Sequence, residues 1–162
     1  MIRAATPADA ESLAVIYDHY VSGAIFTFET EVVDTAEMAR RVSAIAAAGL
    51  PWLVAEVDGR VRAYAYASLW HERTAYRFTV ETTVYVEHDH VRSGLGGRLY
   101  RDLLESLSAG GVHAAIGKIA LPNPASVALH EKLGFEKVAH LREAGWKFDH
   151  WIDVGYWERL LP

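Results

Sequence analysis

Residues 92–97 of this sequence form a glycine-rich turn that could bind an anionic group. The turn reads Arg92-Ser93-Gly94-Leu95-Gly96-Gly97, follows the apolar stretch Val84 to Val86, and precedes leucines spaced four residues apart. This pattern predicts a strand, a turn and then an amphipathic helix. The first N–H groups of a helix have no partner inside the helix, and glycine lets a ligand approach the backbone closely. The stretch is therefore a candidate cradle for a pyrophosphate group.

The glycine turn matches neither of two common nucleotide-binding motifs. A Walker-type phosphate loop is excluded because no Gly-Lys-Ser/Thr follows the turn. The glycine spacing also differs from the GxGxxG of dinucleotide-binding folds. A turn with a purely structural role remains the alternative, because glycine is the default residue of tight turns.

The composition is that of a globular protein with its own core. The chain has 162 residues, of which 51% are hydrophobic and 23% charged, so we expect a single domain over residues 1–162. A net charge of −5 argues against general nucleic-acid binding, although Arg92, Arg98 and Arg101 gather beside the glycine turn. The lack of cysteine excludes disulfides, thiolate metal sites and a cysteinyl intermediate. With no apolar run of signal-peptide or membrane-spanning length, we expect a cytoplasmic protein without membrane or nucleic-acid partners.

Periodicity and capping residues predict how the chain is organised. Thr6-Pro7 and Asp34 are typical helix starts, and Asp58-Gly59 between two apolar stretches is a strong hairpin signal. Helices are expected from Thr6 to about Tyr20, Asp34 to Ala48, Leu95 to Leu107 and Asn123 to Leu133. Strands are expected at residues 2–4, 52–57, 60–69, 76–86, 112–119, 136–142 and 147–159. This order predicts an α+β fold, with a mixed sheet flanked by helices on both faces.

Two motifs in the second half of the chain occur together. The first runs from Val91 to Gly96, and the second runs from Asn123 through Ser126 to Leu133-Gly134-Phe135. In this order they resemble the GNAT family of acetyl-CoA-dependent N-acetyltransferases, whose pyrophosphate loop usually reads Gln/Arg-x-x-Gly-x-Gly/Ala. Val91 departs from that pattern, which removes one side-chain contact but leaves the backbone donors in place.

Within that family the whole chain looks most like the phosphinothricin and methionine sulfoximine acetyltransferase branch. The matching runs include residues 51–55, 76–81 and 83–86, and Lys147-Phe148 with Trp151. The resemblance implies a mostly antiparallel central sheet and transfer of an acetyl group from acetyl-CoA, without a metal. The expected acceptor is the α-amine of a small L-amino acid or analogue, such as phosphinothricin, methionine sulfoximine or methionine sulfone. With no cysteine to carry the acetyl group, direct attack in a ternary complex is the expected mechanism.

The resemblance also implies roles on the strand expected at residues 76–86. Glu81 is expected to be the general base that removes a proton from the substrate ammonium. Arg77, roughly 13 Å away at ~3.3 Å per residue, would hold a carboxylate, with Arg73 as a competing ligand. Tyr76 and Phe78 would line the pocket, and Phe28 is a further pocket candidate. Without the resemblance, these residues would be an ordinary polar strand face.

The remaining implied roles concern the co-substrate. Acetyl-CoA contacts are expected at Val84, Tyr85, Val86, Val91, Arg92, Ser93, Gly94, Leu95, Gly96, Gly97, Asn123 and Ser126. Asn123 could equally be a simple helix N-cap. His130 stands where many relatives carry a tyrosine that protonates the departing thiolate. A surface helix histidine is the alternative for His130.

Several functions and assemblies stay open from the sequence. A related acetyltransferase could act on an aminoglycoside, a polyamine or a protein N-terminus, or the chain could be an acyl-CoA-binding module without turnover. His88 and His90 lie two residues apart, but no ligand spacing favours a metal site. The aromatic stretch from Trp146 to Trp157 is either core or part of a homodimer interface, which the branch resemblance implies.

Overall fold

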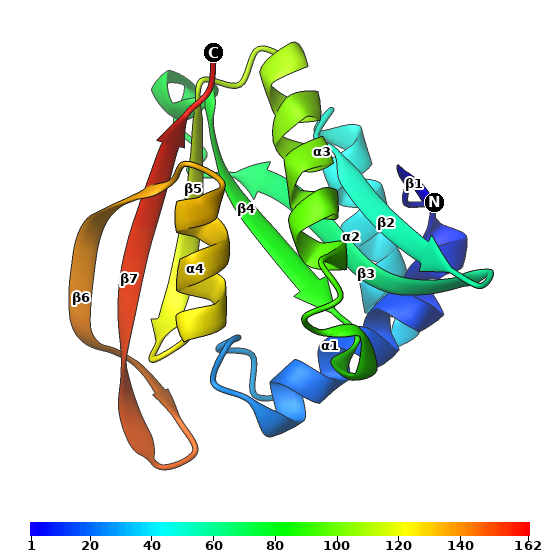
Figure 1. Ribbon diagram of the computed structural model, residues 1–162, viewed down its shortest axis with the longest axis horizontal. Coiled ribbons are helices and arrows are strands. Elements are labelled where there is room, and N and C mark those ends of the chain that lie inside the picture. Colours follow the sequence, from blue (N-terminus) through cyan, green and yellow to red (C-terminus); the bar gives the residue numbers. More distant parts are fainter.

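A seven-stranded sheet with the strand order β1-β2-β3-β4-β5-β7-β6 forms the centre of the molecule (Figure 1). The computed structural model describes residues 1–162. Neighbouring strands are antiparallel except for the parallel pair β4 and β5. The strands are β1 (Ile2–Ala4), β2 (Trp52–Val57), β3 (Arg60–Leu69), β4 (Thr79–Val86), β5 (Ala114–Leu121), β6 (Glu136–Lys147) and β7 (His150–Leu160). The predicted α+β fold with a mixed sheet is confirmed.

Four α-helices cover the two faces of this sheet. They are α1 (Ala10–Gly23), α2 (Thr35–Ala47), α3 (Leu95–Ala109) and α4 (Pro124–Lys132). Helices α1 and α2 lie on one face and α3 and α4 on the other (Figure 1). Short 3-10 turns occur at Pro7–Asp9, Thr74–Tyr76 and His88–His90. None of the helices has the length and apolar character needed to cross a membrane.

Strand β3 shows how the sequence separates the two cores. Its small residues Ala63, Ala65 and Ala67 are fully buried against α3, where they leave room for leucines such as Leu99. Tyr64 points to the opposite face and is buried beneath α1 and α2. Because side chains alternate along a strand, one segment can serve both layers. The predicted alternation is confirmed from Ala63 to Ala67, whereas Val61, which lies beside a register shift with β2, packs in the same core as Tyr64.

The helix starts follow the predicted capping residues with one exception. The Asp34 side chain accepts a hydrogen bond from the Glu37 N–H at 2.8 Å, as expected of an N-cap. At Pro7, however, the chain forms a 3-10 turn, and α1 begins only at Ala10. The Asp9 carboxylate accepts from the Thr6 N–H at 2.8 Å and from the Arg3 guanidinium at 2.7 Å. These contacts hold the tighter turn in place.

Strands β4 and β5 separate after a short stretch of pairing. They pair only from Thr79–Ala114 to Glu81–Ile116. Beyond that point β4 continues beside β3, while β5 continues beside β7, and the two strands diverge (Figure 1). One edge of β4 is therefore left without a strand partner from residue 82 to residue 86.

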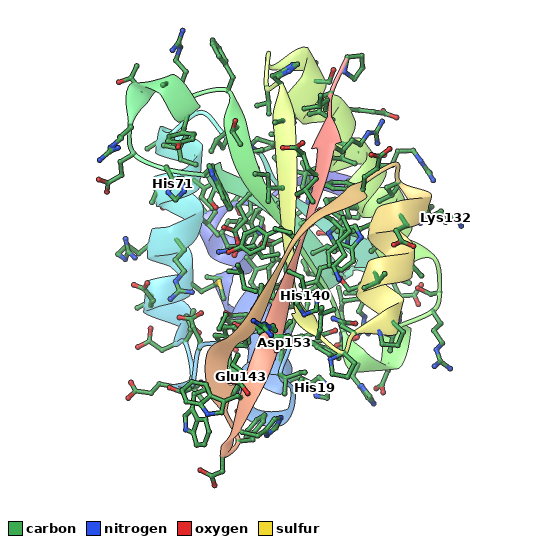
Figure 2. All side chains as sticks on the ribbon, turned by 90° about the vertical axis from the view of Figure 1, so that its left-hand side faces the viewer. His19, His71, Lys132, His140, Glu143 and Asp153 are labelled. Carbon is green, nitrogen blue, oxygen red and sulfur yellow. The ribbon has the colours of Figure 1, made fainter.

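Four predicted strands have other bounds in the structure, and two of them differ only slightly: β5 begins at Ala114 rather than at residue 112, and β7 begins at His150 rather than at residue 147. The strand expected from Tyr76 begins at Thr79, because residues 74–76 form a 3-10 turn. Strand β6 extends to Lys147, past the expected end, because a bulge lets it continue beside β7. At this bulge Asp153 accepts from the Glu143 N–H at 2.8 Å and contacts His140 at 2.7 Å. Figure 2 shows His140 and Asp153 together where β6 crosses β7.

Candidate active site

The opening between β4 and β5 leads into a cavity of about 1190 Å³. It is lined by the separated part of β4, the glycine turn, the middle of β5, α4, and the loop that joins α1 to α2. Ligand pockets in proteins usually measure about 300–1,000 Å³. This cavity is therefore large enough for a bulky ligand together with a small second one.

The glycine turn lies at the N-terminus of α3. Gly94 is the N-cap with φ +80°, a left-handed conformation that favours glycine. A Cβ atom on Gly96 would lie 3.0 Å from a Val86 methyl group, so the turn packs directly on the end of β4. The N–H groups of Gly96 and Gly97, in the first turn of α3, have no acceptor within the helix. The turn thus presents free amides to the cavity, next to the exposed edge of β4.

Not every residue of the predicted turn faces the cavity. Val91, Arg92, Gly94, Gly96 and Gly97 line it. Ser93 and Leu95 do not line it. The hydroxyl oxygen of Ser93 accepts from the Leu95 N–H at 3.3 Å, and the Leu95 side chain is buried in the core. Those two residues shape the turn rather than face a ligand.

The free edge of β4 carries backbone groups that point into the opening. The Glu87 N–H donates to the Arg62 carbonyl at 2.7 Å, so residues 62 and 87 form a hydrogen-bonded pair of β3 and β4. Hydrogen-bonded and non-hydrogen-bonded pairs alternate in antiparallel sheets. The backbone groups of Val84 and Val86 are therefore turned away from β3 and toward the opening. An extended ligand can hydrogen-bond to such an edge as an added strand does.

The carbonyl oxygen of Val86 already has an internal partner. The Tyr20 hydroxyl donates to it at 2.5 Å, which ties the end of β4 to α1. Tyr85 lines the cavity too, but its ring packs against Tyr17 and Tyr20 of α1. Of the three predicted β4 contacts, Val84 thus has the freest backbone groups.

Glu81 lies where β4 leaves β5. One oxygen of its carboxylate is 2.8 Å from Nζ of Lys118, and 25% of the Glu81 side chain is exposed. Lys118 comes from β5, two residues after Ile116, which is the register partner of Glu81. The sequence reasoning missed Lys118, although a single lysine in the apolar run Ala114–Leu121 was a visible signal.

His130 is buried on the floor of the cavity, with only 4% of the residue exposed. Its Nδ1 is 2.7 Å from the Ser126 carbonyl oxygen and therefore carries the proton, and its Nε2 is 3.0 Å from the Tyr100 hydroxyl. Burial lowers the pKa of His130, so the ring is neutral and Nε2 accepts from Tyr100. A Cβ atom on Gly117 would lie 2.4 Å from this nitrogen. The alternative of a surface histidine is thus wrong.

Residues at the start of α4 also reach the cavity. The Asn123 side chain accepts from the Ser126 N–H at 3.1 Å, which makes it a true N-cap of α4. Both residues line the cavity at the same time. The structural role expected as the alternative for Asn123 is therefore present, and it leaves the side chain beside the opening.

The predicted substrate residues fall into two groups. Phe28 lines the cavity, and its ring packs on Gly145 of β6. Four others, all in the segment before β4, do not line it: Arg73, Tyr76, Arg77 and Phe78. The Arg77 guanidinium lies 4.3 Å from the centre of the Phe78 ring and donates to the Thr74 carbonyl. The expected strand face fails here because the strand begins at Thr79, after this turn.

The loop that carries Phe28 is fixed by a buried lysine, Lys147, which lies in one of the matching runs but was given no role from the sequence. Lys147 is 3% exposed, and its Nζ donates to the carbonyl oxygens of Ala24 and Thr27 at 2.8 Å each. Burial lowers the pKa of Lys147. The contacts connect β6 to the loop between α1 and α2, which forms one wall of the cavity.

Three features define the class of site: free amides at the N-terminus of α3, the unpaired edge of β4, and the Glu81 carboxylate at the point where β4 and β5 separate. It suits a ligand with an anionic group and an extended arm, whose far end meets a small polar molecule beside Glu81. The chain belongs to the GNAT acetyltransferase family, whose domain matches residues 2–155.

Two acetyltransferases compared by sequence and one compared by structure resemble the chain over nearly its full length. A phosphinothricin N-acetyltransferase from Streptomyces viridochromogenes is 45% identical, over 98% of this chain and 86% of that protein. An L-methionine sulfoximine/L-methionine sulfone acetyltransferase from Salmonella typhimurium is 34% identical, over 99% and 94%. The structure of a phosphinothricin acetyltransferase from Sinorhizobium meliloti in complex with acetyl-CoA superposes with a TM-score of 0.96. Its identity is 37%, over 99% of this chain and 88% of that one.

Proposed function

We propose that this protein transfers the acetyl group of acetyl-CoA to the α-amine of a small L-amino acid or analogue. Phosphinothricin, methionine sulfoximine and methionine sulfone are the acceptors that the similar proteins suggest. The observation that carries the proposal is the position of Glu81, at the fork of β4 and β5 and inside the same cavity as the free amides of the glycine turn.

The residues present fit acetyl-CoA, which would supply the acetyl group as a reactive thioester. The amides of Gly94, Gly96 and Gly97 would bind the pyrophosphate, supported by the α3 dipole. Val84 and Val86 would bind the pantetheine arm along the free edge of β4, with Asn123 and Ser126 on the facing wall. Val91 precedes the glycine turn and Arg92 is its first residue, and both line the cavity.

Glu81 would act on the acceptor. A protonated amine has no lone pair, so Glu81 takes its proton directly or through a water molecule, a contribution of about 10²–10⁴-fold. The amine nitrogen then bonds to the acetyl carbon, the carbon–sulfur bond breaks, and the sulfur leaves with the electron pair. The nitrogen loses its second proton as it becomes an amide, and the leaving thiolate takes up a proton in its place, so that the products are the N-acetyl amino acid and the free thiol. His130 is not the proton donor in this proposal, because its Nδ1–H donates to the Ser126 carbonyl oxygen and its Nε2 accepts from the Tyr100 hydroxyl. Its neutral ring forms part of the cavity lining.

Thiol release from acetyl-CoA, measured over a panel of amino acids and amines, tests this function. We expect turnover with L-methionine sulfone or phosphinothricin, and a fall in kcat of about 10²–10⁴-fold for Glu81→Gln. Glu105→Gln, on the exposed face of α3, is the matched control and should keep full activity. Turnover with polyamines only would overturn the substrate assignment, and binding of acetyl-CoA without turnover would overturn the activity.

The setting of the enzyme completes the proposal. We propose one acetyltransferase domain over residues 1–162, in the cytoplasm, where its acetyl-CoA supply lies. We also propose a homodimer, because the end of the β6–β7 hairpin exposes large aromatic side chains: Trp146 is 53%, Phe148 50% and Trp151 58% exposed. Light scattering of the purified protein measures the oligomeric mass directly.

A further inference from the structure

The charged side chains around the cavity are strongly unequal in sign. Glu81 is the only Asp or Glu among the residues that line it. The lysines and arginines that line it are Arg92, Arg98, Arg101, Lys118 and Lys132. Such a cavity favours anionic ligands over polycations. The three arginines belong to the glycine turn and α3. Lys132 belongs to α4, and its label in Figure 2 lies on the side of this helix that is turned away from the sheet. The one ion pair of Glu81 is the contact with Lys118.

We infer that Lys118 binds the carboxylate of the acceptor and thereby selects amino-acid zwitterions as substrates. The inference rests on the proposed acetyltransferase function and names the residue that sets its substrate class. It replaces Arg77 and Arg73 as the carboxylate ligand, because neither of them lines the cavity.

The geometry of the ion pair supports this role. Nζ of Lys118 is 2.8 Å from Oε2 of Glu81. In an α-amino acid, a carboxylate oxygen lies about 3 Å from the amine nitrogen of the same molecule. An acceptor whose ammonium binds Glu81 can therefore reach Lys118 with its carboxylate. The ammonium of the acceptor then pairs with the Glu81 carboxylate, and its carboxylate pairs with the Lys118 ammonium.

A substrate without a carboxylate lacks this match. The pair of Glu81 and Lys118 is neutral as a whole, so a simple amine would add a positive charge next to Lys118. Like charges at this distance repel each other, and the acceptor would have to compete with Lys118 for the same carboxylate. A zwitterion instead draws Lys118 toward its own carboxylate and leaves Glu81 free to accept the ammonium proton.

Folding alone gives no reason for a lysine at this position. Strand β5 is otherwise apolar or glycine, and the Lys118 side chain is 40% exposed. An exposed ion pair contributes about 0–1 kcal/mol to stability. Lys118 faces the cavity beside its register partner Tyr156, which also lines it. The ammonium group of Lys118 is thus accessible to a ligand in the cavity and is not part of the core.

The test compares an acceptor that has a carboxylate with one that lacks it. We would measure kcat/KM of the wild type, Lys118→Met and Lys118→Arg with L-methionine sulfone and with its carboxamide. The loss of a charge-assisted contact should lower kcat/KM for the acid by about 10- to 100-fold in Lys118→Met, mostly through KM. The value for the carboxamide should stay level or rise. Lys118→Arg should retain most of the preference for the acid.

Controls separate this inference from the function on which it rests. Lys137→Met makes the same change at a lysine outside the cavity and should leave both acceptors unaffected. Melting temperatures check that each variant is folded. If the wild type acetylates L-methionine sulfone but Lys118→Met keeps the same acid-to-carboxamide ratio, the inference is overturned and the function stands. If the wild type acetylates no amino acid, the function itself is overturned.

Discussion

Replacing Lys147 by methionine should loosen one wall of the cavity without touching the glycine turn. The ammonium of Lys147 makes two hydrogen bonds of 2.8 Å, to the carbonyl oxygens of Ala24 and Thr27. Hydrogen bonds to charged groups contribute about 1.5–3 kcal/mol each, and the burial of the ammonium offsets part of this. Methionine fills the path of the alkyl chain but leaves the two carbonyl groups without a donor. We therefore expect the variant to lose about 2 kcal/mol of stability.

Two measurements test this reasoning. Urea unfolding should show a midpoint lower by roughly 1 M. The KM for the amino-acid acceptor should rise severalfold, because the loop that carries Phe28 is released, while the KM for acetyl-CoA should not change. Lys137→Met, an exposed lysine on the same strand, is the control. An unchanged urea midpoint, or an equal rise of both KM values, would refute the proposed role of Lys147.

Two further predictions concern the core and the pH dependence. Gly117→Ala places a Cβ atom 2.4 Å from Nε2 of His130 and should lower the free energy of unfolding by about 1–3 kcal/mol, measured by thermal unfolding. Gly23→Ala, whose Cβ atom would have no neighbour within 4 Å, is the control and should lower it far less. Equal losses in the two variants would show that His130 does not pack on β5. The Arg3 guanidinium lowers the pKa of Asp9 to about 2, so the pair stabilises the fold above the ordinary pKa of 3.8 and loses this contribution as pH falls toward 2. Between pH 5 and pH 2, the free energy of unfolding of the wild type and of the control Asp102→Asn should fall by about 2 kcal/mol through the protonation of Asp9. Asp9→Asn should lack this part of the fall. An identical pH profile for Asp9→Asn would exclude the contribution of the Arg3–Asp9 pair.

Much of the fold was predictable because its signals are local. The Asp34 cap, the Asp58-Gly59 hairpin and the alternation of β3 from Ala63 to Ala67 depend on residues close together in the sequence, and the structure contains all of them. The glycine turn is predictable for the same reason, since the left-handed conformation of Gly94 and the start of α3 follow from a few consecutive residues.

The errors arise where a local pattern meets a tertiary constraint. The alternation of residues 76–86 suggested one long strand, but the chain turns at residues 74–76 and removes Arg77 from the face that carries Glu81. Periodicity does not say where a strand starts, because a turn and a strand end can carry the same residues. The substrate residues expected in this segment depended on that start.

The sequence by itself determined the family, the position of the glycine turn and the choice of Glu81 as the candidate general base. Only the tertiary structure decided what surrounds that carboxylate. The contact between Glu81 and Lys118, residues from strands joined by a whole helix, exists because β4 and β5 pair in one particular parallel register and then diverge. The carbonyl groups around Lys147 and the neutral, buried ring of His130 likewise depend on elements far apart in the chain. Partners of this kind are set by packing, whose distances no local sequence pattern encodes.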